Sequence, residues 1–438
     1  MAGRIFAVVG EICEMRKIYK YSSAITSQLA FCATPLRLDS YNHCQFSCGY
    51  CFARTREGYG RDEKLQIANP ESLKKRLKRV ADGVIRSALD EFIQMRIPFQ
   101  MGGMSDPFSP VEIKERRTLQ YIRILNEYDY PFIISTKSSL PGTIEYTDAL
   151  GDSNGYVRFS TTVVSEKDRA SIDKGCPPIR EVADAAERLS ALNIPVSFRM
   201  QPIIPGHEDN FDRLLALARN VGVKHISAEY LKVPLEANVN FSRPLLGLLG
   251  GEPIATYMKL GSRKQGSEYA LPLSYRAAHL IYMRGETKAA GITFGFADNE
   301  LLLHSDGGSC CSASDLYLRN ASFFSANIVA LAKKKMIGEL ITFDDFIGEW
   351  MPQSSIATYL NSKSRLEKTD VESAKWITYL RAIWGGNYGL YSPSYFDGVI
   401  DTGTKDLAGL PVYMRVLSEF EMSMGFALPV KCLEYVSI

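Results

Sequence analysis

The stretch PFIISTKSSLPGTIEYTDALGDSNGYVRFSTTV (131–163) contains two strand candidates on either side of a segment of different character. Its first six residues and its last eight are rich in aromatic and β-branched side chains, which favour strands. The residues between them are long enough for the crossover that two parallel strands require. This strand–crossover–strand unit is the pattern from which we predict the fold.

The same alternation extends along most of the chain. The other strand candidates are PLRLDSYN (35–42), IPFQMGG (97–103), PVSFRMQPII (195–204), KHISAEYL (224–231) and GITFGFA (291–297). Apolar residues recur at helical spacing between them, for example in 73–89, 182–192 and 211–218. Repeated βα units predict a parallel sheet with crossover helices. We therefore expect an α/β fold, a partial (β/α)6 barrel with a mostly helical C-terminal extension, whose functional groups lie at the carboxyl ends of the strands.

Three parts are expected along the chain. Residues 1–35 form an N-terminal segment that packs on the barrel and begins with a strand, residues 36–300 form the barrel with an insert at 232–273, and residues 301–438 form a helical and aromatic domain that covers the active site. All three tryptophans follow residue 300. Two interpretations of this aromatic part remain open, namely ordinary core packing and a lid that stacks on a planar substrate.

Composition sets limits on location and partners. The chain has 438 residues and a formal charge of +2, so global electrostatics do not select a nucleic-acid partner. It has no apolar run of membrane-spanning length, and we expect no membrane partner. An odd count of nine cysteines argues against a disulfide framework. We expect a cytoplasmic protein with reduced thiols.

The stretch HCQFSCGYCF (43–52) holds three of the cysteines, Cys44, Cys48 and Cys51. Three closely spaced thiolates suit either zinc or an iron–sulfur cluster. A structural zinc site needs four protein ligands. His43 could be the fourth, but it adjoins Cys44, and adjacent residues rarely reach one ion from the same side. No second pair of cysteines at this spacing follows. A four-iron cluster held by three cysteines leaves one iron open to a small molecule, and we favour that interpretation.

The spacing Cys44-x3-Cys48-x2-Cys51, with an aromatic at Tyr50, resembles the signature of the radical S-adenosylmethionine (SAM) enzymes. GGMSDPFSPVE (102–112), IISTKS (133–138), VRFSTT (157–162) and QPIIPG (201–206) resemble, in order, segments of the branch that contains spore photoproduct lyase and the related DNA repair photolyase-like proteins. The resemblance covers residues 36–230. It implies a [4Fe–4S] cluster on the three cysteines, SAM as cofactor, and a reductant such as flavodoxin or ferredoxin.

The resemblance also implies which residues contact SAM. Tyr50 would line the adenine, the two glycines would let the backbone approach the methionine part, Ser105 and Asp106 would face its ammonium group, and Lys137 would pair with its carboxylate. The full set of expected SAM contacts is Tyr50, Gly102, Gly103, Ser105, Asp106, Lys137, Ser160 and Arg199. From the residues alone, Arg199 could instead pair with an acid inside the barrel.

The implied activity is reductive cleavage of SAM to a 5′-deoxyadenosyl radical, which takes a hydrogen atom from a nucleic-acid or nucleotide substrate in repair or modification. The reaction type, whether lyase, isomerase or transferase, stays open. The alternatives are a radical SAM epimerase or maturase acting on a peptide or small metabolite, and a non-catalytic partner protein that retains the fold.

One departure from the lyase concerns its hydrogen donor. Spore photoproduct lyase returns a hydrogen atom through a cysteine downstream of the cluster motif, and this chain has no cysteine from 52 to 175. The remaining thiol candidates are Cys176, Cys310 and Cys311. We take Cys310 and Cys311 as the candidate hydrogen donors, because they follow the last strand candidate and could approach the barrel mouth.

Overall fold

The computed structural model describes residues 18–26, 28–51, 53, 64–360, 375–386 and 391–426. The strand expected within residues 1–17 lies outside these described residues. The side chain of Cys310 is also outside the described part.

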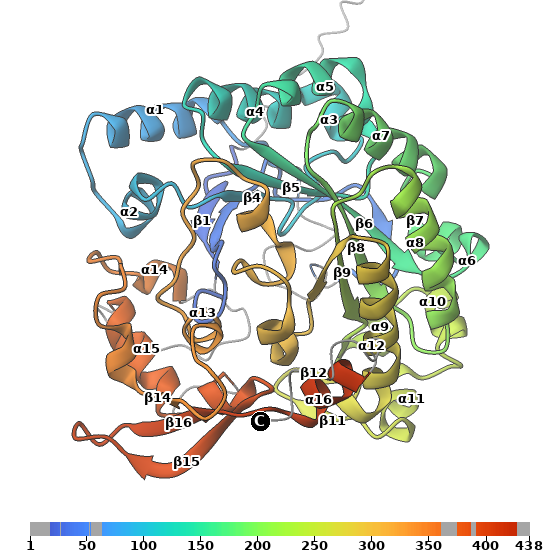
Figure 1. The fold of residues 1–438 in the computed structure, drawn as a ribbon. Helices are drawn as coiled ribbons and strands as arrows, with labels where there is room; N and C mark the ends of the chain where they lie inside the picture. Colours follow the sequence, from blue (N-terminus) through green and yellow to red (C-terminus); the bar gives the residue numbers. More distant parts are fainter. Residues whose placement is uncertain are drawn as a thin grey trace, which may run out of the picture.

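The centre of the molecule is an eight-stranded sheet with the order β1-β2-β4-β5-β6-β8-β9-β13. β1 is antiparallel to β2, and the seven strands from β2 to β13 are parallel to one another. The strands are β1 (Ser23–Ile25), β2 (Leu36–Leu38), β4 (Phe99–Met101), β5 (Phe132–Thr136), β6 (Gly155–Val163), β8 (Val196–Ile203), β9 (His225–Tyr230) and β13 (Thr293–Phe296). The sheet curves and stays open between β1 and β13 (Figure 1). The predicted α/β partial barrel is confirmed, with β13 as a seventh parallel strand beyond the six of a (β/α)6 unit.

Helices cover the outer side of this sheet (Figure 1). They are α1 (Pro70–Ala81), α2 (Ala88–Gln94), α3 (Val111–Glu115), α4 (Arg117–Glu127), α5 (Ile144–Gly151), α6 (Glu166–Ile172), α7 (Ile179–Ala191), α8 (Phe211–Asn220) and α12 (Leu273–Ala289). In α7 the buried residues Val182, Ala186 and Leu189 follow helical spacing and join the same core as Phe159 of β6. Each fully buried side chain of valine or leucine size contributes about 1.5–3 kcal/mol, so this apolar stripe holds the helix on the sheet.

The inner face of the sheet carries polar side chains beside the small apolar cluster of Ile133, Tyr156 and Leu318. Side chains alternate along a strand, and the outward members of β6, such as Val157 and Phe159, belong to the main core. The inward members include Arg158, whose guanidinium bonds Ser135 of β5 and Gln100 of β4. We call the side of the sheet that these inward side chains face the lumen.

The expected insert at 232–273 contains α9 (Ala237–Asn240), α10 (Arg243–Leu248), α11 (Pro253–Lys259) and the antiparallel sheet β10-β12-β11. These strands are β10 (Val233–Pro234), β11 (Arg263–Gln265) and β12 (Glu268–Ala270). The insert reaches the cysteine loop, because the backbone N–H of Ser242 donates to the carbonyl oxygen of Gly49 over 3.0 Å.

The C-terminal part combines short helices with a small sheet that the sequence pattern did not predict. Its elements are α13 (Ile328–Lys333), α14 (Ala357–Leu360), α15 (Trp376–Trp384), α16 (Glu419–Phe426) and the antiparallel strands β14 (Leu340–Ile341), β16 (Pro411–Arg415) and β15 (Val399–Lys405). Trp376 and Trp384 are fully buried, and their indole N–H groups donate to the carbonyl oxygens of Ala326 and Pro411. These two rings therefore serve as core.

Candidate functional site

The cysteine loop follows β2 at the carboxyl edge of the sheet and is fixed from two sides. Its short strand β3 (Ser47–Cys48) pairs with β7 (Asp173–Lys174), and Cys48 is in register with Asp173. The backbone N–H of Gly49 donates to the carbonyl oxygen of Ile172 over 2.6 Å. A Cβ at Gly49 would overlap the hydroxyl of Ser242, so only glycine lets the loop lie this close to the insert.

The thiols of this loop are largely shielded from solvent. Cys48 is buried, and Cys44 and Cys51 are half-buried. Burial, followed by the nearby Asp106 and Cys48, raises the pKa of the Cys44 thiol well above its usual value. The sulfur of Cys176 lies 3.9 Å from that of Cys48. Sequence reasoning did not foresee this contact between residues 128 positions apart.

The donor set fits a soft metal centre in its chemistry. Three thiols come from one loop, and thiolates are the preferred ligands of iron–sulfur clusters and zinc. Among the described residues, no three His, Cys, Asp or Glu side chains already stand together as a metal-binding group. A cation, Lys137, lies close to the thiols: burial opposes its charge, but Asp173, Cys48 and Cys176 together raise its pKa above the ordinary value.

A buried network joins Lys137 to the cysteine loop. The hydroxyl of Tyr50 donates to Asp173 and lies 2.6 Å from the Thr162 hydroxyl, which in turn donates to Asp173 over 2.9 Å. The Lys137 ammonium is 3.4 Å from the same carboxylate and 5.3 Å from the centre of the Tyr50 ring. Burial would raise the pKa of Asp173, but the charge of Lys137 and the hydrogen bonds that Asp173 accepts lower this pKa.

Asp173 is the residue that sequence reasoning missed. It accepts bonds from two residues expected to contact SAM, and Arg169 approaches it to 3.8 Å. Its position depends on the pairing of β3 with β7, which joins residues far apart in the chain. The available signal was the carboxylate three residues before Cys176, in IDKGCPP (172–178).

The loop after β4 is built around Gly102 and Asp106. Gly102 has φ +90°, and a Cβ there would overlap the carbonyl oxygen of Ser135 on β5, so this turn requires glycine. Asp106 accepts from the Lys137 backbone N–H at 2.7 Å and from the Thr136 hydroxyl at 2.7 Å. These bonds tie the end of β4 to the end of β5 and bring the expected residues to one edge.

Other expected SAM contacts have partners within the protein or lie on the lumen. The Ser105 hydroxyl donates to the Tyr41 carbonyl oxygen over 2.5 Å. Gly103 follows Gly102 in the same turn and is exposed. Ser160 on β6 is half-buried and in register with Arg199 on β8. Arg199 lies 3.5 Å from the carboxylate of Glu229, which is the acid pairing that the sequence left open.

The candidate hydrogen donors lie on β13's side of the lumen. Cys310 and Cys311 belong to a 3₁₀ turn at Cys310–Ser312, where the Cys311 carbonyl oxygen is 2.6 Å from Nε2 of His225. His225 is the first residue of β9, so Cys311 lies towards the amino-terminal ends of the strands. By contrast, Cys176 lies at the cysteine loop.

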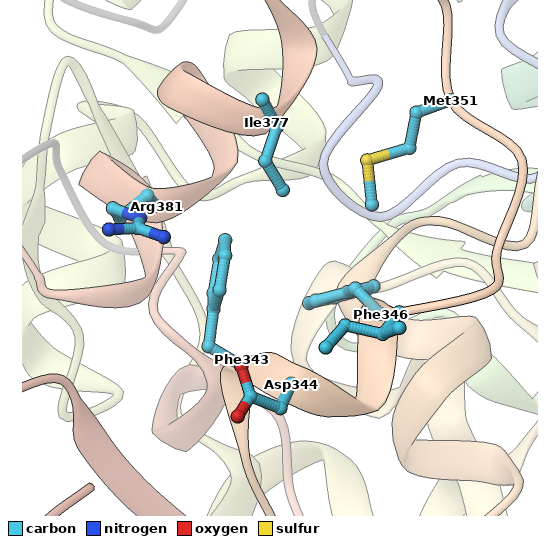
Figure 2. Close-up of a pocket in the computed structure, with 7 residues that line it drawn as sticks. Phe343, Asp344, Phe346, Met351, Ile377 and Arg381 are labelled. Carbon is cyan, nitrogen blue, oxygen red and sulfur yellow. The ribbon is translucent and has the colours of Figure 1, made fainter. Parts of the chain in front are cut away.

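A separate hollow lies in the C-terminal part (Figure 2). It encloses about 260 Å³, and Arg381 stands 5.1 Å from the centre of the Phe343 ring in its wall. Phe343, Asp344, Phe346, Ile347, Met351, Ile377 and Arg381 line it. None of these residues was expected from the sequence, and the lining shares no residue with the site described above.

The fold and the site define an α/β protein with an open parallel barrel and a three-cysteine loop at its carboxyl edge. No protein-family model and no curated protein matches the sequence. Among solved structures, spore photoproduct lyase complexed with dinucleoside spore photoproduct is similar at a TM-score of 0.49 and 13% identity, covering 64% of this chain and 81% of that one. SuiB of Streptococcus suis bound to S-adenosylmethionine is similar at a TM-score of 0.40 and 11% identity, covering 61% and 50%.

These similarities include the enzyme that the sequence motifs had already suggested. No helix in the described ranges is long and apolar enough to cross a membrane.

Proposed function

We propose that this chain is a radical SAM enzyme. The observation that carries the proposal is the loop with Cys44, Cys48 and Cys51, which follows the first parallel strand, contains Tyr50 and lies against Lys137 and Asp173. Thiolates from the three cysteines would hold a [4Fe–4S] cluster. When bound, the cluster and SAM would supply one-electron reductive cleavage and a 5′-deoxyadenosyl radical for hydrogen abstraction.

The chain's own groups would bind and orient the cofactors. Lys137 carries a positive charge beside the thiols and offsets part of the negative charge of thiolate ligands. Asp173 fixes Lys137 and the Tyr50 ring together. Gly102 leaves the edge of β4 free of a side chain.

The substrate proposed is a nucleic acid or a nucleotide, as the motif resemblance implies, with flavodoxin or ferredoxin as the class of reductant. A radical SAM epimerase or maturase acting on a peptide or a small metabolite is the second candidate. The missing lyase cysteine between 52 and 175 favours it. Cys310 and Cys311 remain the proposed donors, and Cys311 is supported by its half-buried thiol near Arg158 in the lumen.

The test is SAM cleavage by anaerobically reconstituted protein with dithionite. We expect 5′-deoxyadenosine from the wild-type chain and from Cys32→Ser, in which the thiol lost lies outside the motif. Cys48→Ala should produce none. Equal yields from Cys48→Ala and the wild type would refute the cluster assignment.

A further inference from the structure

Among the described residues, Arg158 is the buried arginine that has no carboxylate partner. Four arginines are buried in the described residues, and three of them, Arg169, Arg276 and Arg415, lie within 4 Å of a carboxylate. Arg158 is 4% exposed and bonds only neutral groups: Ser135 at 2.7 and 3.0 Å, and the Gln100 side-chain oxygen at 2.9 Å. Buried charges are normally paired because leaving them unpaired is costly.

The guanidinium of Arg158 is held in place without being neutralised. Gln100 is itself oriented, because its amide nitrogen donates to the carbonyl oxygen and hydroxyl of Thr34 at 2.5 and 2.7 Å. The hydrogen bonds of Arg158 use Nε and Nη2, which leaves Nη1 without a partner among the described residues. A fixed guanidinium with a free N–H edge is suited to a carboxylate or a phosphate.

Further unpaired donors lie beside it on the lumen face. Arg199 has a buried Nε without a hydrogen-bond partner, and the buried hydroxyl of Ser227, in register with Arg199, has none either. Glu229 is the carboxylate here, and it already faces two cations, Arg199 at 3.5 Å and Lys232 at 2.7 Å. Among the described residues of this face, the cations Arg158, Arg199 and Lys232 therefore outnumber the carboxylate Glu229.

Part of this face is accessible to solvent. Ser160, Arg199 and Gln201 are half-buried, whereas their outward neighbours Phe159 and Met200 are fully buried. Burial, followed by the charge of Arg199, lowers the pKa of Arg158 to about 10, so Arg158 still carries its charge at neutral pH. The Cys311 thiol also lies close enough to Arg158 to influence the pKa of Arg158.

We propose that Arg158, assisted by Arg199 and Ser227, binds an anionic group of the substrate, a carboxylate or a phosphate, inside the lumen. The assignment of this anion to the substrate rests on the proposed function. The bound group would supply the missing counter-charge and would place the rest of the substrate between Arg158 and the cysteine loop.

The test is anion binding by the full chain without SAM, measured by calorimetric titration with inorganic phosphate or acetate against sodium chloride at equal ionic strength. We expect saturable binding of at least one anion, weakened at least tenfold in Arg158→Gln and unchanged in Arg180→Gln, which removes the same charge from the exposed face of α7. A preference for phosphate indicates a nucleotide substrate, and a preference for acetate a carboxylate substrate.

A second variant, Ser135→Asp, supplies the missing carboxylate while keeping Arg158, and it should abolish anion binding even if Arg158→Gln folds poorly. Equal binding by Ser135→Asp and the wild type, or no binding beyond chloride by the wild type, would overturn the proposal. Because the titration needs neither SAM nor a reductant, its failure can be distinguished from a failure of SAM cleavage.

Discussion

At the scale of single residues, two buried arginines, Arg276 and Arg158, differ in whether a carboxylate pairs with them. Arg276 lies 3.0 Å from Asp298 and also bonds Glu300, whereas Arg158 meets only neutral acceptors. Removing one member of a buried pair leaves the other charge without compensation, and this is far more costly than removing an unpaired charge. The two residues therefore serve as matched variants.

We expect Arg276→Gln to lower the free energy of unfolding by about 3–5 kcal/mol, because Asp298 then remains buried without its partner. Arg158→Gln should lower it by less than about 1 kcal/mol, or raise it. Urea unfolding monitored by circular dichroism measures both. A larger loss for Arg158→Gln than for Arg276→Gln would contradict the assignment of Arg158 as an unpaired charge.

Asp173 is the residue on which the network at the cysteine loop depends. In Asp173→Asn the carboxamide cannot balance Lys137, which loses its carboxylate partner, and Arg169 is left with Glu166 at 3.4 Å. We expect a loss of about 3–5 kcal/mol in the free energy of unfolding and a weaker affinity for SAM in equilibrium dialysis. Glu127→Gln, which removes an exposed partner of Lys74, is the control and should change neither quantity. Unaltered SAM binding in Asp173→Asn would show that Asp173 does not contribute to the cofactor site.

At the scale of elements, the turn after β4 depends on the absence of a side chain. Gly102→Ala places a Cβ against the Ser135 carbonyl oxygen at φ +90°. We expect it to cost about 2–4 kcal/mol in stability, from backbone strain and overpacking. Gly83→Ala also has a positive φ, +78°, but nothing lies within 4 Å of its new Cβ, so it should cost only about 1 kcal/mol. Thermal unfolding of the two variants compares them, and equal losses would show that the close contact with β5 does not matter.

The attachment of α16 should depend on pH. His304 lies 2.7 Å from Asp397 and 3.4 Å from Glu421 of α16. Burial alone would lower the pKa of His304, but these two carboxylates raise it above its usual value. A raised folded pKa means that the stabilisation is fully present below about pH 6.5, the unfolded value, and is lost as pH rises through the folded pKa.

We therefore expect the wild-type melting temperature to fall between pH 6 and pH 9 by more than that of His304→Gln, which lacks the titrating group. Hydrogen exchange in α16 should rise over the same interval in the wild type. Parallel melting profiles for the two proteins would show that His304 is not the source of the dependence.

Periodicity predicts elements well where burial follows strand or helix spacing. The stripe Val182, Ala185 and Leu189 predicted α7, and the seven strand candidates all appear in the sheet. The pairing of β3 with β7 was not predictable, because it joins two-residue segments through long-range contacts. The small sheet β14-β16-β15 was missed because exposed residues dominate β15, which leaves no apolar alternation in that strand.

At the scale of the whole molecule, the parallel sheet gathers at one edge the groups that the sequence separates. The chain order predicted that Cys44, Asp106 and Lys137 would meet there, because the carboxyl ends of parallel strands share an edge. It did not predict that Cys176 would lie beside Cys48 or that Asp173 would join Lys137 to Tyr50. These contacts arise from how the connections after the strands fold over the barrel.

The central claim is a [4Fe–4S] cluster with one iron open to SAM. The most direct measurement is the electron paramagnetic resonance spectrum of the anaerobically reconstituted, reduced chain before and after addition of SAM. We expect about four iron and four sulfide ions per chain and a signal that changes when SAM binds. A spectrum that SAM leaves unchanged, or a chain that holds zinc and no sulfide, would contradict it.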